Sequence, residues 1–164
     1  MPWYFSFAEF GPDAINSLLK KAPFCSLPAT LSNYEVAFKG KSRKWGGALA
    51  TLEGKKGNTV FGALHLVTPD ELALITRYHR ENYQAKQVNV NVSVTHDKFP
   101  AVTFMYAKED VDGFPSEDYV KEIIRNLKFF WGQDDGKTPA LEDFGIMIEY
   151  KAKKQPKVKN NGNK

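Results

Sequence analysis

An alternation of valine with small polar residues is the feature that most restricts how this chain folds. The valines are Val88, Val90, Val92 and Val94, and the residues between them are Asn89, Asn91 and Ser93. Successive side chains of a β-strand point to opposite faces of the sheet, so the valines share one face and the polar residues share the other. The pattern therefore predicts a strand over residues 88–94 with a buried valine face and a solvated polar face.

Further segments of strand character lie on both sides of this one. They are rich in aromatic and β-branched residues, and turn signals separate them, the clearest at residues 54–58. The predicted strands are residues 3–8, 34–38, 48–52, 60–66 and 101–107. Together with residues 88–94, they make β-structure the main element of the chain.

Three segments carry helix signals instead. Residues 12–19 form a short helix, residues 68–71 form a capping box with proline at the first helical position, and Ser116 precedes two acidic residues and an apolar periodic stretch. Strands outnumber helices, and the two kinds do not strictly alternate. We therefore expect an α+β domain, a mainly β barrel or curled sheet with helices packed outside it.

The positive charge of the chain is concentrated at one end. The net charge is +4, but residues 151–164 hold six lysines and no acidic residue, which leaves 17 basic against 19 acidic residues elsewhere. The body of the chain is therefore mildly acidic and does not predict a nucleic-acid-binding face. We expect a single domain over residues 1–150 and a disordered lysine-rich tail, with a tail that tethers the domain to an acidic partner as an alternative.

Apolar content and cysteine content exclude other classes. Hydrophobic residues make up 42% of the chain, enough for one core, but no apolar stretch approaches the ~20 residues that cross a bilayer. The amino terminus lacks the basic start of a secretory signal, so we expect a cytoplasmic protein without membrane contact. Cys25 is the only cysteine and can form neither an internal disulfide nor a paired-thiolate metal site, and we expect an inert buried thiol.

Four short motifs follow one another over residues 3–130. They are Tyr4-Phe-Ser-Phe7-Ala8-Glu9-Phe10, then Trp45-Gly46-Gly47, then Val60-Phe61-Gly62 leading to Thr68-Pro69, and last Pro115-Ser116 to Tyr119. In order and spacing, this series resembles the gamma-glutamylcyclotransferase-like superfamily. The resemblance implies a small mixed β-barrel with flanking helices around one pocket, a small-molecule substrate, and neither metal nor cofactor.

The same resemblance implies a reaction. Members of the superfamily turn the substrate's α-amine onto its own side-chain carbonyl and release 5-oxoproline. A glutamate carries the proton, and backbone N–H groups of a Gly-Ser-Asn turn hold the anionic oxygens. This sequence has Ala8-Glu9-Phe10 at that turn and, counted without a gap from the capping box, His79 at the glutamate. Glu81 reaches that position only through a two-residue shift, so we expect 5-oxoproline release to be slow or absent.

Glu9 and His79 together indicate a rebuilt acid–base site. A carboxylate beside an imidazole orients it and raises its pKa, which suits histidine for proton transfer near neutral pH. The alternative is that Glu9 faces solvent and His79 only ends a helix, where the helix dipole favours a cation. The expected substrate-binding residues around this pair are Phe7, Ala8, Phe10, Trp45, Gly46, Gly47, Tyr83, Tyr106 and Tyr119.

Two functions from different classes remain open. The first is a gamma-glutamylcyclotransferase-like enzyme, a monomer or homodimer, that cyclises a small amide or amino-acid-like metabolite through His79, Glu9 or Glu81. The second is a catalytically silent module of the same fold that binds a small ligand or a partner. His65 is expected to be a hydrogen-bonded wall residue rather than a ligand, and the histidine spacing predicts no zinc site.

Overall fold

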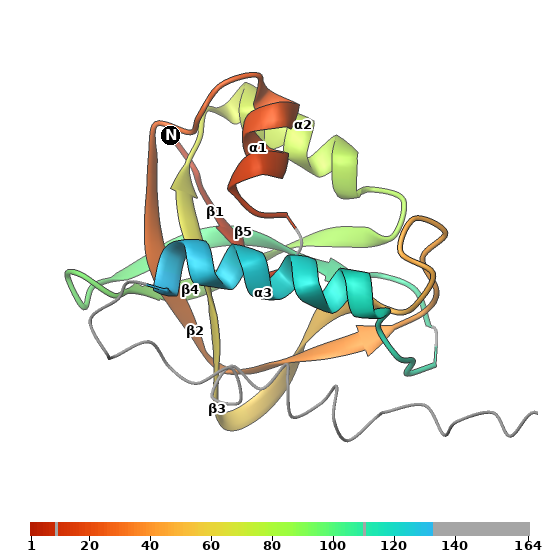
Figure 1. The fold of residues 1–164 in the computed structure, drawn as a ribbon. Helices are drawn as coiled ribbons and strands as arrows, with labels where there is room; N and C mark the ends of the chain where they lie inside the picture. Colours follow the sequence, from red (N-terminus) through yellow and green to blue (C-terminus); the bar gives the residue numbers. More distant parts are fainter. Residues whose placement is uncertain (9, 110, 133–164) are drawn as a thin grey trace, which may run out of the picture.

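Five strands close into a barrel, and helices pack on its outside (Figure 1). The computed structural model describes residues 1–8, 10–109 and 111–132. The strands are β1 (Trp3–Ser6), β2 (Cys25–Lys39), β3 (Leu49–Leu66), β4 (Tyr83–Val92) and β5 (Lys98–Tyr106), in the barrel order β1-β3-β2-β4-β5. A parallel contact between Tyr4 and Val102 closes the barrel. The expected α+β barrel is confirmed.

The helices occupy two sides of the barrel. They are α1 (Pro12–Leu19), α2 (Pro69–His79) and α3 (Glu117–Trp131). α1 and α2 lie side by side, and α3 runs across another face (Figure 1). The side-chain hydroxyl of Ser116 accepts the hydrogen bond from the Tyr119 N–H that starts α3, which confirms the expected cap.

The β2–β3 hairpin differs from its prediction. β3 is one strand from Leu49 to Leu66, so the strands expected at 48–52 and 60–66 are continuous, and the turn expected at 54–58 is a bulge. The register skips Asn33 on β2 and residues 55–58 on β3. Asn33 and Gly57 take positive φ values of 65° and 88°, which these two residue types tolerate, and the Gly57 N–H donates to Asn33 Oδ1 at 3.1 Å. A glycine-rich turn signal and a glycine-rich bulge look alike in sequence.

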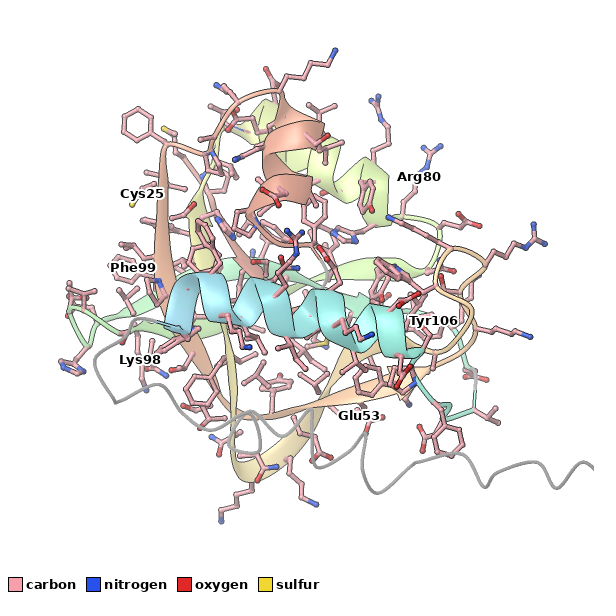
Figure 2. The ribbon with its side chains drawn as sticks, in the orientation of Figure 1. Cys25, Glu53, Arg80, Lys98, Phe99 and Tyr106 are labelled. Carbon is pink, nitrogen blue, oxygen red and sulfur yellow. The ribbon has the colours of Figure 1, made fainter. Side chains whose placement is uncertain are left out.

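Several strand ends also differ from the sequence prediction. β4 begins at Tyr83 rather than at residue 88, and β5 begins at Lys98 rather than at residue 101. β1 ends at Ser6 rather than at residue 8, and β2 begins at Cys25 rather than at residue 34. Cys25 lies on the outer side of β2 and is partly exposed, so the expectation of a buried thiol is wrong (Figure 2). Val94 is 73% exposed because β4 ends at Val92, although the other three valines are buried as predicted.

Two clusters of buried side chains make the core. The larger fills the barrel and extends to α3, and it includes Phe5, Leu31, Phe38, Leu64, Val90, Tyr119 and Ile123. The smaller lies where α1 and α2 meet the barrel, and it includes Tyr4, Phe10, Ile15, Leu19, Ile75 and Phe104. The end of α2 and the segment after β1 thus meet in the smaller cluster, which is where the candidate site lies.

Candidate functional site

Helix α2 carries His79 as its last residue, and a capping box fixes where the helix begins. Thr68 Oγ1 accepts a hydrogen bond from the Glu71 N–H at 3.1 Å, and the Glu71 carboxylate accepts one from the Thr68 N–H at 2.8 Å. Lys21 makes an ion pair with Glu71 at 2.7 Å. The bonds from Lys21 and Thr68 lower the pKa of Glu71. The predicted capping box is confirmed, and α2 runs 11 residues from it to His79.

Aromatic rings surround the His79 imidazole. It stacks on Phe104 with 4.7 Å between ring centroids, and Phe10 and Tyr83 meet it edge-on at 5.0 and 5.5 Å. Burial lowers the pKa of His79 to about 4, because the charged imidazolium would lose its hydration there. The imidazole is therefore neutral at neutral pH. The next residue, Arg80, is exposed and points away from the barrel (Figure 2).

The Nε2 atom of His79 is buried and has no hydrogen-bond partner within the described residues. A buried polar atom without a partner costs about 1–3 kcal/mol, so such atoms are uncommon in folded proteins. The neighbouring polar groups are engaged: Tyr83 donates to the Ala50 carbonyl at 2.8 Å, and Thr103 donates to the Phe5 carbonyl at 2.9 Å. Nε2 is thus the atom that a bound polar group would satisfy.

A small pocket lies beside His79. Its volume is about 20 Å³, room for roughly one water-sized group. Nine described residues line it: Tyr4, Phe7, Ala8, Phe10, Ala50, His79, Tyr83, Thr103 and Phe104. The walls are mainly aromatic, and they come from β1, the segment after it, β3, α2, β4 and β5.

The structure brings together part of the predicted site. Phe7, Ala8, Phe10 and Tyr83 line the pocket with His79. Glu9 lies outside the described residues, so the predicted Glu9–His79 pair stays a prediction. Within the described residues, desolvation is the cause of the His79 pKa shift, and its direction is opposite to the rise that a neighbouring carboxylate would give.

Glu81, the alternative catalytic residue, is exposed in the connection between α2 and β4. It is not among the residues that line the pocket. The gapless count from the capping box is therefore the one that places a residue at the pocket, and that residue is His79.

The other predicted residues form a second group next to the pocket. Trp45 packs on Tyr119 with 5.3 Å between centroids, and Tyr119 accepts a hydrogen bond from the Ala50 N–H at 2.8 Å. Tyr106 meets Tyr83 edge-on at 5.8 Å. Ala50 therefore joins the two groups, because its N–H is bound by Tyr119 and its carbonyl by Tyr83.

Gly46 and Gly47 belong to this second group for reasons of backbone shape. Gly46 has a φ of 76°, a region that glycine adopts readily, and its N–H donates to the Ser42 carbonyl at 2.9 Å. A Cβ on Gly47 would lie 2.7 Å from the Phe114 carbonyl oxygen and the Ser116 nitrogen. Neither glycine lines the pocket at His79.

Sequence reasoning missed four lining residues: Tyr4, Ala50, Thr103 and Phe104. Thr103 is fully buried, which is unusual for a polar residue in the middle of a strand. A polar residue inside an apolar strand such as 101–107 was the available signal. Tyr4 and Phe104 resemble core aromatics in sequence, and their ring centroids are 5.8 Å apart, so only the fold reveals their role as walls.

His65 is a buried histidine that does not line this pocket. It is 1% exposed, its Nε2 is 2.8 Å from Ser6 Oγ, and its Nδ1 is 2.7 Å from Ser26 Oγ. Burial lowers its pKa to about 3. The prediction of a hydrogen-bonded wall residue is confirmed.

Two searches of the described residues concern other classes of site. They contain no group of three or more histidine, cysteine, aspartate or glutamate side chains that could hold a metal ion. None of the helices in the same part of the chain is both long enough and apolar enough to span a bilayer.

A closed five-stranded barrel with outer helices defines the class, an α+β barrel protein. The family model for "Gamma-glutamyl cyclotransferase, AIG2-like" proteins matches residues 10–121, more than half of the chain. The chain therefore belongs to the gamma-glutamyl cyclotransferase, AIG2-like family, and the expected family is confirmed. No curated protein sequence gives a significant match.

Solved structures show the same fold. A gamma-glutamyl cyclotransferase is 18% identical with a TM-score of 0.75, and 88% of this chain and 85% of that chain are covered. An uncharacterised protein from Homo sapiens is 18% identical with a TM-score of 0.74 and the same coverage. A protein from Arabidopsis thaliana is 22% identical with a TM-score of 0.57, and 94% of each chain is covered.

Proposed function

We propose that the pocket beside His79 receives the amine end of a small amide or amino-acid-like metabolite, and that His79 carries a proton while this molecule cyclises. The chain would then be a cyclotransferase-like enzyme of the cytoplasm with a rebuilt site. The observation that supports the proposal is the buried, unpartnered Nε2 of His79 in a pocket of this family's fold.

The walls of the pocket suit an ammonium group. Aromatic rings attract cations by about 0.5–2 kcal/mol when the cation is desolvated over the ring face. Phe10, Tyr83 and Phe104 all lie within ring-contact distance of His79. An ammonium group there would also donate to Nε2, a buried side-chain nitrogen that has no hydrogen-bond partner among the described residues.

The basicity of His79 matches the task better than its residue type suggests. With a pKa of about 4, the imidazole is about as basic as a glutamate carboxylate, whose ordinary value is about 4.3. It is also in its proton-accepting form throughout the neutral range. What it lacks is the negative charge that would draw an ammonium group in and stabilise the proton it accepts.

The proposed reaction needs one proton shuttle. His79 takes a proton from the substrate ammonium, and the amine nitrogen then attacks the side-chain carbonyl carbon. The imidazolium gives this proton to the amide nitrogen as the C–N bond breaks, and the second proton of the attacking nitrogen then passes through His79 to the departing amine, which leaves as an ammonium ion. Because an imidazolium is poorly solvated among aromatic rings, we expect turnover well below the ~1–10³ per second of competent enzymes.

The second candidate function is binding without turnover. Two observations favour it: the pocket has a volume of only about 20 Å³, and no carboxylate is among its described lining residues. A silent module would bind the amine at Nε2 and release it unchanged. The two candidates differ in product formation and agree on the binding site.

The experiment compares binding and product formation on the same samples. Gamma-glutamyl amines and simple amines are titrated against the protein while the His79 imidazole is followed by NMR, and 5-oxoproline is measured in parallel. We expect the NMR signals of the His79 imidazole to shift until the ligand saturates the site. His79→Gln should lose binding, and His96→Asn should retain it, because His96 lies in the turn after β4, far from the residues that line the pocket.

Each outcome decides one point. Binding with slow product that His79→Gln abolishes supports the enzyme, and binding without product supports the silent module. No ligand shift at His79 with any amine rejects both. Glu9→Gln tests the predicted pair: if it lowers the His79 pKa, the two residues are coupled, and an unchanged pKa removes Glu9 from the site.

A further inference from the structure

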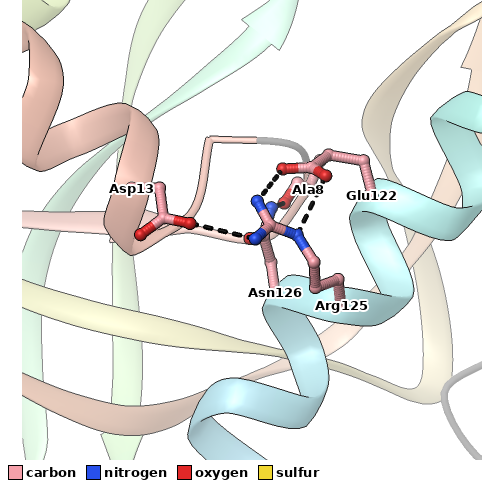
Figure 3. Close-up of polar contacts among 5 residues, drawn as sticks. All are labelled: Ala8, Asp13, Glu122, Arg125 and Asn126. Carbon is pink, nitrogen blue, oxygen red and sulfur yellow. Dashed lines mark hydrogen bonds and ion pairs between the residues drawn. The ribbon is translucent and has the colours of Figure 1, made fainter.

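Helix α3 contacts one wall of the pocket. The described wall residues are Ala8 and Phe10, which line the pocket, and Gly11, which follows them. Asn126 on α3 does not line that pocket, yet its Nδ2 donates to the Ala8 carbonyl at 3.1 Å (Figure 3). Asn126 is 8% exposed on a helix face whose other buried members are Tyr119, Val120, Ile123 and Leu127. A buried amide on such a face is retained only when it is hydrogen-bonded.

Gly11 also lies close to the Asn126 side chain. A Cβ on Gly11 would overlap the Asn126 side-chain amide. The Gly11 backbone is extended, with a φ of −88°, so an alanine would suit its conformation, and its Cβ would displace the Asn126 amide. The Gly11 carbonyl accepts the Ile15 N–H at 3.0 Å and so starts α1.

Arg125 of α3 contacts α1, the helix that follows the wall residues. Its guanidinium donates to Asp13 Oδ2 at 3.0 Å and holds Glu122 through two bonds of 2.8 and 3.1 Å (Figure 3). This cluster is exposed, so its contribution to stability is small. The cluster adds a third point of contact, because α3 contacts Ala8 and Gly11 through Asn126 and Asp13 through Arg125.

We propose that Asn126 is a positioning residue, which with Gly11 sets how closely Phe10 is held against His79 and therefore which ligands fit the pocket. This inference depends on the proposed function in one respect, because it takes the pocket at His79 as the ligand site. Phe10 lies between two contact points, Ala8 and Gly11, and its ring meets His79 at 5.0 Å. A displaced wall would open the 20 Å³ pocket to larger groups and to water.

The test is a double-mutant cycle read at His79 and needs no ligand. Gly11→Ala displaces the Asn126 amide and so breaks its hydrogen bond to the Ala8 carbonyl, which frees the wall. Water should then reach the imidazole, and the His79 pKa should rise by about 1 toward its ordinary value of about 6.5. The edge-on ring-current shift that Phe10 imposes on His79 should fall at the same time. In the Asn126→Ala background, where the overlapping amide is gone, Ala at position 11 should add nothing further.

Two more variants separate the hydrogen bond from the overlap. Asn126→Asp keeps the size of the side chain but replaces the donor with an oxygen beside the Ala8 carbonyl, so it should raise the His79 pKa even if Gly11→Ala does not fold. Gly54→Ala is the matched control, because a Cβ there meets no atom within 4 Å. It should leave both the pKa and the ring-current shift at wild-type values.

The results of the double-mutant cycle can be told apart from a failure of the proposed function. If no amine binds but the two substitutions act non-additively on the His79 pKa, Asn126 is a positioning residue and the proposed function is wrong. If the folded Asn126 variants lose thermal stability while the pKa and the ring-current shift of His79 stay unchanged, Asn126 only stabilises the fold, and this inference is overturned.

Discussion

His65 and His79 should make the protein unusually sensitive to mild acid, because burial lowers the pKa of both, and the fully buried His65 is the sharper case. It is 1% exposed, and burial lowers its pKa to about 3. In the unfolded chain, the same imidazole titrates at about 6.5. Between these two values the unfolded state binds a proton that the folded state excludes, so the free energy of unfolding falls as the pH drops below about 6.5.

The magnitude follows from the two pKa values. Lowering the pH from about 7.5 to about 5 protonates His65 almost completely in the unfolded chain and hardly at all in the folded protein. The loss is then about 2 kcal/mol for His65. The carboxyl group of Glu71 does not interfere, because its lowered pKa affects stability only below its unfolded value of about 4.5. A loss of 2 kcal/mol is a large share of the ~5–15 kcal/mol of a typical domain.

The assay is urea unfolding over this pH range for wild type and His65→Gln. Glutamine can still bond to Ser6 or Ser26 but does not titrate. His79 and every other group titrate in both proteins, so the difference between the two curves isolates His65. We expect wild type to lose about 2 kcal/mol more than the variant between about pH 7.5 and pH 5. Parallel curves would refute the reasoning, because they would mean that His65 is protonated equally in both states.

Three further predictions concern the contacts that hold the second group and the end of the chain. Tyr119→Phe removes the acceptor of the Ala50 N–H and should cost about 1–3 kcal/mol in urea unfolding, with no change in overall fold by circular dichroism. Gly47→Ala should cost more than about 1 kcal/mol, because its Cβ would lie 2.7 Å from backbone atoms just before α3, whereas Gly54→Ala should stay within about 0.5. Deletion of residues 151–164 should leave the melting temperature unchanged, since this lysine-rich segment has little apolar surface to bury; a fall of several degrees would show that it packs on the barrel.

The fold was readable from sequence where local chemistry decides it. The capping box at Thr68 and the serine cap before α3 each define a helix start through side-chain bonds that are specific to short motifs. The valine alternation of β4 likewise predicted a buried face correctly, since Val88, Val90 and Val92 are buried. The errors occur where geometry depends on a partner strand: the bulge of β3 needs Asn33 of β2 to accept from Gly57, and nothing near residue 57 indicates this.

The site was readable only in part, for a related reason. His79 follows from counting along one helix, which local sequence fixes. Tyr4, Thr103 and Phe104 reach the pocket because β1 and β5 close the barrel through a parallel contact, and a single sequence does not show which strands meet. The low pKa of His79 is equally non-local, since it comes from rings contributed by α2, β4, β5 and the segment after β1.

The contacts that hold this fold together are separate from the atoms that would do chemistry in it. The capping box fixes the end of α2 whatever residue stands at position 79, the two tyrosine bonds to Ala50 fix β3, and the Asn126 bond fixes Ala8. A solved structure that is only 18% identical to this chain has the same fold. Replacing a carboxylate with a neutral imidazole of similar basicity keeps a proton acceptor but removes about one unit of charge from a pocket of low polarity. The pocket should consequently prefer ammonium ions over neutral amines only weakly, through its aromatic walls. A carboxylate at position 79, as in His79→Glu, should strengthen the preference for the cation, and equal affinity of this variant for both forms would contradict the argument.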